Sequence, residues 1–186
     1  MSREEACGAP GAWSCLDGLA RGAAPGHAAP RQPLVSFVFT GFAQSALVGA
    51  DILEARGSAA AFCAAMGEMG SRRSDLGEMF RAATLRDLRD RGHEIGLQGA
   101  RKDPHAARRT PACFEAELTA DIERLARLGC GRALASYRHG EGRVAAHERR
   151  TVAAVFSLGF GGRRGINRGR CDRAQAAQAA PQGAQQ

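Results

Sequence analysis

Four residues in two predicted loops have side chains that could bind a metal ion. Asp103 and His105 follow one predicted strand, and His139 and Glu141 follow another. Carboxylate and imidazole groups are common ligands of zinc. Such pairs also arise easily in loops exposed to solvent. We therefore favour solvated loop residues as the interpretation and keep a displaced metal site as the alternative.

Cationic side chains could instead bind an anionic sugar or a phosphate. Lys102 is the single lysine among 26 basic residues, and Arg163, Arg164, Arg168 and Arg170 lie in a predicted basic turn over 161–170. The net charge is +7, but the dominance of arginine, alanine and glycine is typical of a GC-rich codon bias. No aromatic residues alternate with these arginines, which argues against nucleic acid as a partner.

The histidine and cysteine residues do not complete a known short motif. His93 and Glu94 would begin a HExxH zinc motif, but Leu97 occupies the position of the second histidine. We therefore predict a hydrogen-bonded, structural His93 at the start of a strand. None of the six cysteines is spaced as CxxC, and we predict Cys63 and Cys113 to be thiols of the core.

Strands and helices alternate along the chain. The predicted strands span 34–39, 59–64, 94–97 and 133–137, and the predicted helices span 45–57, 85–91, 110–129 and 144–158, with a long loop or broken helix over 66–80. The helix that begins at Thr110 and Pro111 has the clearest apolar stripe, namely Phe114, Leu118, Ile122, Leu125 and Leu128. Strand and helix in alternation predict a parallel sheet with right-handed crossovers, as in half of an eightfold barrel or a small open sheet.

Composition sets the expected limits of the domain. Hydrophobic residues make up 44% of the chain and aromatic residues 5%, which predicts a core of Ala, Leu, Val and Ile. We predict a flexible arm over 1–32, one domain over 33–172 and a disordered tail over 173–186. No secretory signal and no apolar run of membrane-spanning length is evident, so we expect a cytoplasmic protein without a membrane partner.

Three segments, in the same order, resemble the polysaccharide deacetylases, the NodB-homology enzymes of carbohydrate esterase family 4. Residues 92–96 (GHEIG) resemble the segment before the family's HTYSH motif, and residues 35–42 (VSFVFTGF) resemble its first motif, SFTFDDF. Residues 51–57 (DILEARG), followed by Ala61 and Phe62, resemble ILExxG…ATFF. The resemblance covers about residues 33–172. It implies a partial or distorted (β/α) barrel of the polysaccharide-deacetylase type.

In that family an aspartate and two histidines hold a divalent metal, usually zinc, and a second aspartate is the general base. The metal lowers the pKa of a bound water and polarises the acetyl carbonyl, and the base takes the proton. The resemblance places Thr40 at the base position and Gly41, Gln98 and Lys102 at the metal positions. None of these residues can perform the corresponding role, so neither the base nor any metal ligand is intact.

The resemblance therefore implies a deacetylase-like protein of carbohydrate metabolism that does not hydrolyse acetyl groups and needs no cofactor, with the last barrel strands missing. A glycan is the expected partner, and His139, Glu141 and Arg143 are the candidate sugar contacts. Two alternatives stay open. One is a non-catalytic protein that binds a glycan or an anionic polymer through its arginines, and the other is a decayed reading frame. The ancestral glycan and the oligomeric state are not indicated by the sequence.

Overall fold

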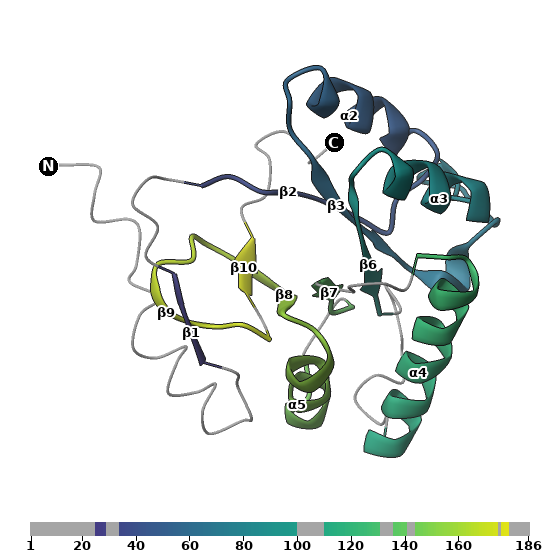
Figure 1. The fold of residues 1–186 in the computed structure, drawn as a ribbon. Coiled ribbons are helices and arrows are strands. Elements are labelled where there is room, and N and C mark those ends of the chain that lie inside the picture. The colour runs from purple at the N-terminus through teal and green to yellow at the C-terminus, as the bar shows by residue number, and fades with distance from the viewer. Residues whose placement is uncertain are drawn as a thin grey trace, which may run out of the picture.

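A computed structural model describes residues 25–28, 34–99, 110–130, 136–140, 144–174 and 176–178 of the chain. Over these residues the protein is a mixed α/β structure, in which six parallel strands form a curled half-barrel sheet and four helices accompany it (Figure 1). The predicted α/β class and the predicted parallel strands are therefore confirmed.

The six strands of the main sheet are β2 (Phe37–Thr40), β3 (Ala60–Ala64), β6 (Glu94–Gln98), β7 (Ser136–Arg138), β8 (Leu158–Arg164) and β10 (Ala176–Gln178). The four helices are α2 (Ala46–Glu54), α3 (Ala82–Asp90), α4 (Pro111–Arg127) and α5 (Ala146–Val155). A short 3-10 helix, η1 (Met66–Glu68), and two antiparallel pairs complete the described elements. These pairs are β4 (Arg72–Arg73) with β5 (Gly77–Glu78), and β1 (Pro25–Ala28) with β9 (Gly169–Asp172).

The strands of the main sheet neighbour one another in chain order, from β2 at one end to β10 at the other. Phe39 lies opposite Phe62 on β3, and Phe62 lies opposite Ile95 on β6. A helix separates each of the first four strands, β2, β3, β6 and β7, from the next. Because every strand is parallel to its neighbour, all carboxyl ends lie along the same edge of the sheet.

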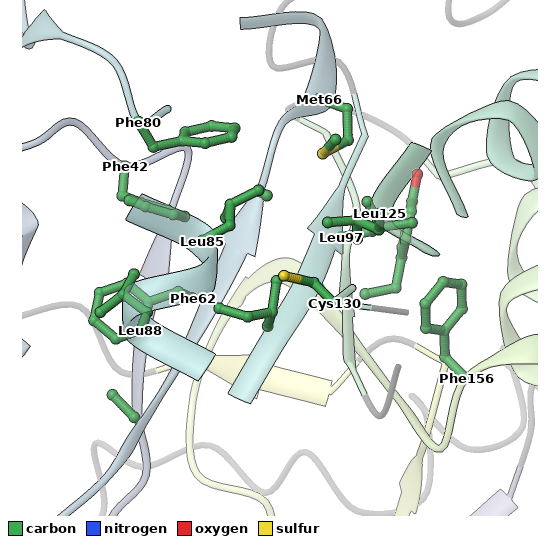
Figure 2. Packing of buried hydrophobic residues seen from close by; sticks show 14 of the residues in the cluster. Phe42, Phe62, Met66, Phe80, Leu85, Leu88, Leu97, Leu125, Cys130 and Phe156 are labelled. Carbon is green, nitrogen blue, oxygen red and sulfur yellow. The ribbon is translucent and has the colours of Figure 1, made fainter. Parts of the chain in front are cut away.

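Side chains that alternate along the strands form two hydrophobic clusters. Phe62, Leu97 and Tyr137 belong to the larger cluster, which packs between the sheet and the helices (Figure 2). Cys63, the next residue after Phe62, belongs instead to a small cluster with Phe160 and Ala176. Successive strand residues point to opposite faces, so this second cluster lies on the face of the sheet away from the helices.

The core is mostly Ala, Leu, Ile and Val by number, as predicted, but it also holds most of the aromatic residues. Six of the eight phenylalanines are buried, together with the single tyrosine: Phe42, Phe62, Phe80, Phe114, Phe156, Phe160 and Tyr137. Phe62 stacks on Phe39 with ring centroids 4.5 Å apart, and Phe42 stacks on Phe80 at 4.7 Å. The few aromatic residues thus join the aliphatic residues in the core, because the fold gathers nearly all of them at its centre.

Helix α4 matches the prediction at both ends. The Thr110 hydroxyl accepts a hydrogen bond from the backbone N–H of Cys113, and Pro111 occupies the first turn, where no N–H is needed. Gly129 follows the helix with a φ of +78°, a conformation that favours glycine. Within the predicted stripe, Phe114, Leu118 and Leu125 are buried. In contrast, the predicted core thiol Cys113 is exposed, because it lies on the opposite side of the helix.

The carboxyl-terminal third contains more sheet than predicted. The predicted basic turn over 161–170 is mostly strand, since β8 continues to Arg164 and β9 begins at Gly169. Part of the predicted tail is strand β10, which pairs with β8, and Ala174 and Ala176 are buried. The prediction of four strands is therefore wrong. Small residues with little β-propensity concealed the additional strands, whose stability comes from pairing and burial.

Strand β1 lies inside the segment predicted as an arm. Residues 133–135, the start of the strand predicted over 133–137, lie outside the described residues. The long loop predicted over 66–80 holds η1 and the β4–β5 pair.

Candidate functional site

The carboxyl ends of β2, β6 and β7 form the edge of the sheet at which the sequence predicted chemistry. Thr40 ends β2 and is followed by Gly41, and Gln98 ends β6. Arg138 ends β7 and is followed by His139. The sheet order places β3 between β2 and β6, so Gly41 and Gln98 are separated by one strand and by 57 positions in sequence.

Gly41 and Gln98 nevertheless meet. A Cβ atom built on Gly41 would lie 3.1 Å from Nε2 of Gln98. The backbone N–H of Gly41 donates to the carbonyl of Cys63 on the intervening strand at 3.2 Å, so the pairing of β2 with β3 continues to Gly41. The carboxamide of Gln98 thus occupies the space next to Gly41 that a side chain at position 41 would need.

Gln98 is a buried amide with an unsatisfied acceptor. The residue is 6% exposed, and its Oε1 has no hydrogen-bond partner within the described residues. Leaving a buried carbonyl oxygen without a donor costs about 1–3 kcal/mol. The end of β6 at Gln98 is therefore polar and buried, and this side chain does not stabilise the folded protein.

These residues do not fit a zinc ion. Gly41 has no side chain, Gln98 contributes a neutral amide, and the Thr40 hydroxyl is neither a metal ligand of choice nor a base near neutral pH. Among the residues described by the structure, no group of three or more His, Cys, Asp or Glu side chains could hold a metal ion. Lys102, Asp103, His105, Glu141 and Arg143 lie outside the described residues, so the displaced metal site and two of the sugar contacts stay predictions.

His139, the remaining predicted sugar contact, is buried in a polar cluster behind the strand end. It is 2% exposed, and its Nε2–H donates to the carbonyl of Ala174 at 2.7 Å. Burial, helped by the nearby charges of Arg138 and Arg149, lowers the pKa of His139 to about 4, against the opposing effect of the Ala174 bond. His139 is a neutral structural group in this position, with its Nε2–H committed to the backbone.

The polar cluster around His139 was not predicted from the sequence. Arg149 on α5 lies 3.6 Å from Asp172 at the end of β9, and both side chains are nearly buried. Asp172 accepts a hydrogen bond from the backbone N–H of Ala174 at 2.9 Å. Two side chains therefore hold Ala174 in the turn before β10. His139 donates to the carbonyl of Ala174, and Asp172 accepts from its backbone N–H. No sequence pattern signals this, because the partners come from three separate elements.

His93 has the structural role that the sequence predicted. Its Nδ1 accepts a hydrogen bond from the backbone N–H of Ala60 at 3.1 Å, so Nε2 carries the proton and donates to Glu54 at 2.8 Å. The Arg91 guanidinium holds the pKa of the Glu54 carboxyl below its usual range, against the opposing effect of burial, and His93 lowers it as well. His93 thus ties the start of β3 to helix α2.

Cys63 is the predicted core thiol. It is buried, and burial raises its pKa to about 12 despite the nearby Ser136 hydroxyl, which lies 3.9 Å from its sulfur. A thiol that stays protonated at neutral pH is a poor nucleophile.

Arg168 in the predicted basic turn is exposed, and the side chains of the other three arginines lie outside those described.

Position 99 has no room for a side chain larger than that of glycine, because Tyr137 lies against it. A Cβ built on Gly99 would lie 2.5 Å from the phenolic oxygen of Tyr137 and 3.5 Å from the ring carbon that bears it. We expect Gly99→Ala to lower the free energy of unfolding by about 1–3 kcal/mol, since the buried Tyr137 must move. Tyr137→Phe removes the clashing oxygen, so the double variant should recover part of that loss. A urea double-mutant cycle would measure the coupling, and additive effects would contradict the contact.

Comparison with known proteins identifies no relative: no protein-family model, no curated protein and no solved structure matches the chain. No helix in the described part of the chain is long and apolar enough to cross a membrane.

Proposed function

We propose that this chain is a polysaccharide deacetylase-like protein that has kept the position of the catalytic site and lost the hydrolytic reaction. The single observation that carries the proposal is the meeting of Gly41 with Gln98. The resemblance in sequence assigns these two residues to two ligand positions of one metal ion, without any knowledge of the fold. Two ligands of one ion must be close in space, and these two positions are adjacent.

The backbone at position 41 also supports the proposal. Gly41 has a φ of +50°, in the left-handed region. Aspartate and asparagine enter this region more readily than other residues with side chains. An aspartate, the residue that the family has there, is thus one of the few side chains that this backbone accommodates.

The loss of reaction follows from the side chains. Metal-assisted deacetylation needs a cation held by carboxylate and imidazole groups, and a base to take a proton from water. Thr40, Gly41 and Gln98 supply a hydroxyl, no side chain and an amide. We propose that the chain can interact with a glycan at this edge of the sheet but does not cleave an acetyl group from it.

The metal content of a revertant tests the proposal. The revertant carries Thr40→Asp, Gly41→Asp, Gln98→His and Lys102→His, which restores the four family residues. Its matched control carries Thr40→Asn and Gly41→Asn with the same two histidines, and so has nearly the same shape without the carboxylates. After dialysis against zinc and removal of free metal, we expect one zinc per chain in the revertant, and little in the control or the natural chain.

Two results would contradict the proposal. Near-stoichiometric zinc in the natural chain would point to a displaced site around Asp103, His105, His139 and Glu141, and deacetylation assays would follow. A revertant with a native circular dichroism spectrum but no zinc would show that positions 40, 41, 98 and 102 do not form a family site.

A further inference from the structure

Strand β2 lies at one end of the main sheet, with β3 as its only partner among the described strands (Figure 1). No described strand pairs with its other edge, and the backbone N–H and C=O groups of such an edge can template pairing with another strand. Natural proteins usually block such an edge with charged residues, proline or a bulge. Residues 34–40 (LVSFVFT) contain no charged residue and no proline.

Large apolar side chains are exposed on β2, on the residues directly before it and on helix α2, which lies against β2 at Gly49 and Phe39. Their exposed fractions lie between 48% and 80%, and they are Leu34, Val35, Phe37, Val48 and Ile52, here called the β2–α2 patch. These are five of the eight large hydrophobic residues that are exposed in the described part of the chain. Such clustering is typical of a surface that is covered in the functional state.

The charges of α2 do not interrupt the patch. Asp51 and Glu54 both bind Arg91, which follows α3, so they face the neighbouring helix. Gly49, on the other side of α2, lies against the ring of Phe39 on β2. Val48 and Ile52 are one helical turn apart on the outer face, away from the fully buried Ala50. The outer surface of α2 next to β2 is therefore apolar.

We propose that a second copy of this chain covers the β2–α2 patch, with β2 pairing antiparallel to β2 of the other copy across a two-fold axis. An uncharged strand is self-complementary, because no like charges come to lie opposite each other. With the axis at Val38, Phe37 lies opposite Phe39 of the second copy. Opposite residues share a face of the sheet, so the two α2 helices come to lie on the same side.

The size of the patch fits a dimer of modest affinity. Five side chains of this exposure present on the order of 500 Å² per copy, whereas a standard interface buries roughly 800 Å² per partner. The backbone edge of β2 with Ser36 and Thr40 supplies further area. A single strand from a different protein would pair with β2 alone, whereas the two-fold arrangement also uses α2. This inference is independent of the proposed function.

Sedimentation velocity over a concentration series of the full chain tests the proposal. We expect a monomer–dimer equilibrium in the natural chain. Phe37→Lys on the strand and Ile52→Lys on the helix should each weaken it about tenfold or more, because each places a charge in the interface. Val155→Lys and Ile166→Lys are the controls, since both residues are comparably exposed but lie on α5 and in the β8–β9 turn. Circular dichroism verifies that all four variants are folded.

A natural chain that stays monomeric at all concentrations would overturn the proposal, whether or not a different protein binds the patch. A dimer that persists in both patch variants would also overturn it, by placing the interface elsewhere. If Phe37→Lys dissociates the dimer and Ile52→Lys does not, strand pairing without α2 would replace the two-fold arrangement.

Discussion

Phe62→Ala is expected to lower the free energy of unfolding by about 3–5 kcal/mol, the usual effect of truncating a fully buried aromatic residue. Phe62 is fully buried and connects three elements of the core. Its ring stacks on Phe39 of β2, and the ring centroids of Phe42 and His93 lie 5.3 Å and 5.2 Å from its own. Phe62 and Phe42 are both labelled in Figure 2. Truncation leaves a cavity that stiff neighbouring rings cannot fill, and urea unfolding followed by circular dichroism would measure the loss.

Two further variants make this prediction specific. Phe62→Leu keeps most of the volume and should lose clearly less stability than Phe62→Ala. Ile166→Ala removes an exposed side chain in the turn after β8 and should change the free energy of unfolding by at most about 0.5 kcal/mol. Equal losses for Phe62→Ala and Ile166→Ala would contradict the position of Phe62 at the centre of the core.

The elements that the sequence predicted correctly are those with local signals. Helix α4 has a capping threonine, a proline in its first turn and an apolar stripe, and all of these lie within one segment of the chain. His93 was also predicted correctly as a structural residue, since its position at a strand start limits what it can contact. Glu54, its partner, lies 39 positions away and could not be identified without the fold.

The elements that were missed depend on contacts that are distant in sequence. Strand β10 consists of Ala176, Ala177 and Gln178, which resemble a disordered tail in composition. It is a strand because β8 pairs with it and because Ala176 is buried against Cys63 and Phe160. Amino-acid composition reflects only the intrinsic preference of a segment. This segment forms a strand because of its contacts with other parts of the chain.

In the candidate site, too, the sequence indicated individual residues but not the contacts between distant parts of the chain. Gly41 and Gln98 could be singled out by resemblance to family motifs, but their contact depends on the register of β2, β3 and β6. The unsatisfied Oε1 of Gln98 is likewise a property of its surroundings. The burial of His139 could not be foreseen, because its partner Ala174 lies in a segment that was predicted as tail.

The buried state of His139 predicts a strong dependence of stability on pH. Its pKa in the folded protein is lowered to about 4, from the ordinary value of 6.5 for a histidine. The unfolded chain therefore binds a proton more readily than the folded one at pH values between these two. Stability from this histidine is fully present above the unfolded pKa and is lost as the pH falls through the folded pKa. Between about pH 7 and about pH 4.5 the expected loss is roughly 2 kcal/mol.

His139→Gln separates this effect from other titrating groups. The Gln side chain can still donate a hydrogen bond toward the carbonyl of Ala174, but it does not titrate. Glu54 also loses stabilisation in acid, whereas Asp121, whose pKa burial raises, has the opposite effect. Both groups contribute equally to the two proteins, so the difference in unfolding free energy between the natural chain and His139→Gln isolates His139. We expect that difference to shrink as the pH falls from 7 to 4.5, because only the natural chain is destabilised by proton uptake on unfolding at this position. A difference that is independent of pH would show that His139 stays accessible to protons, and would place it at the surface of the strand-end site instead of behind it.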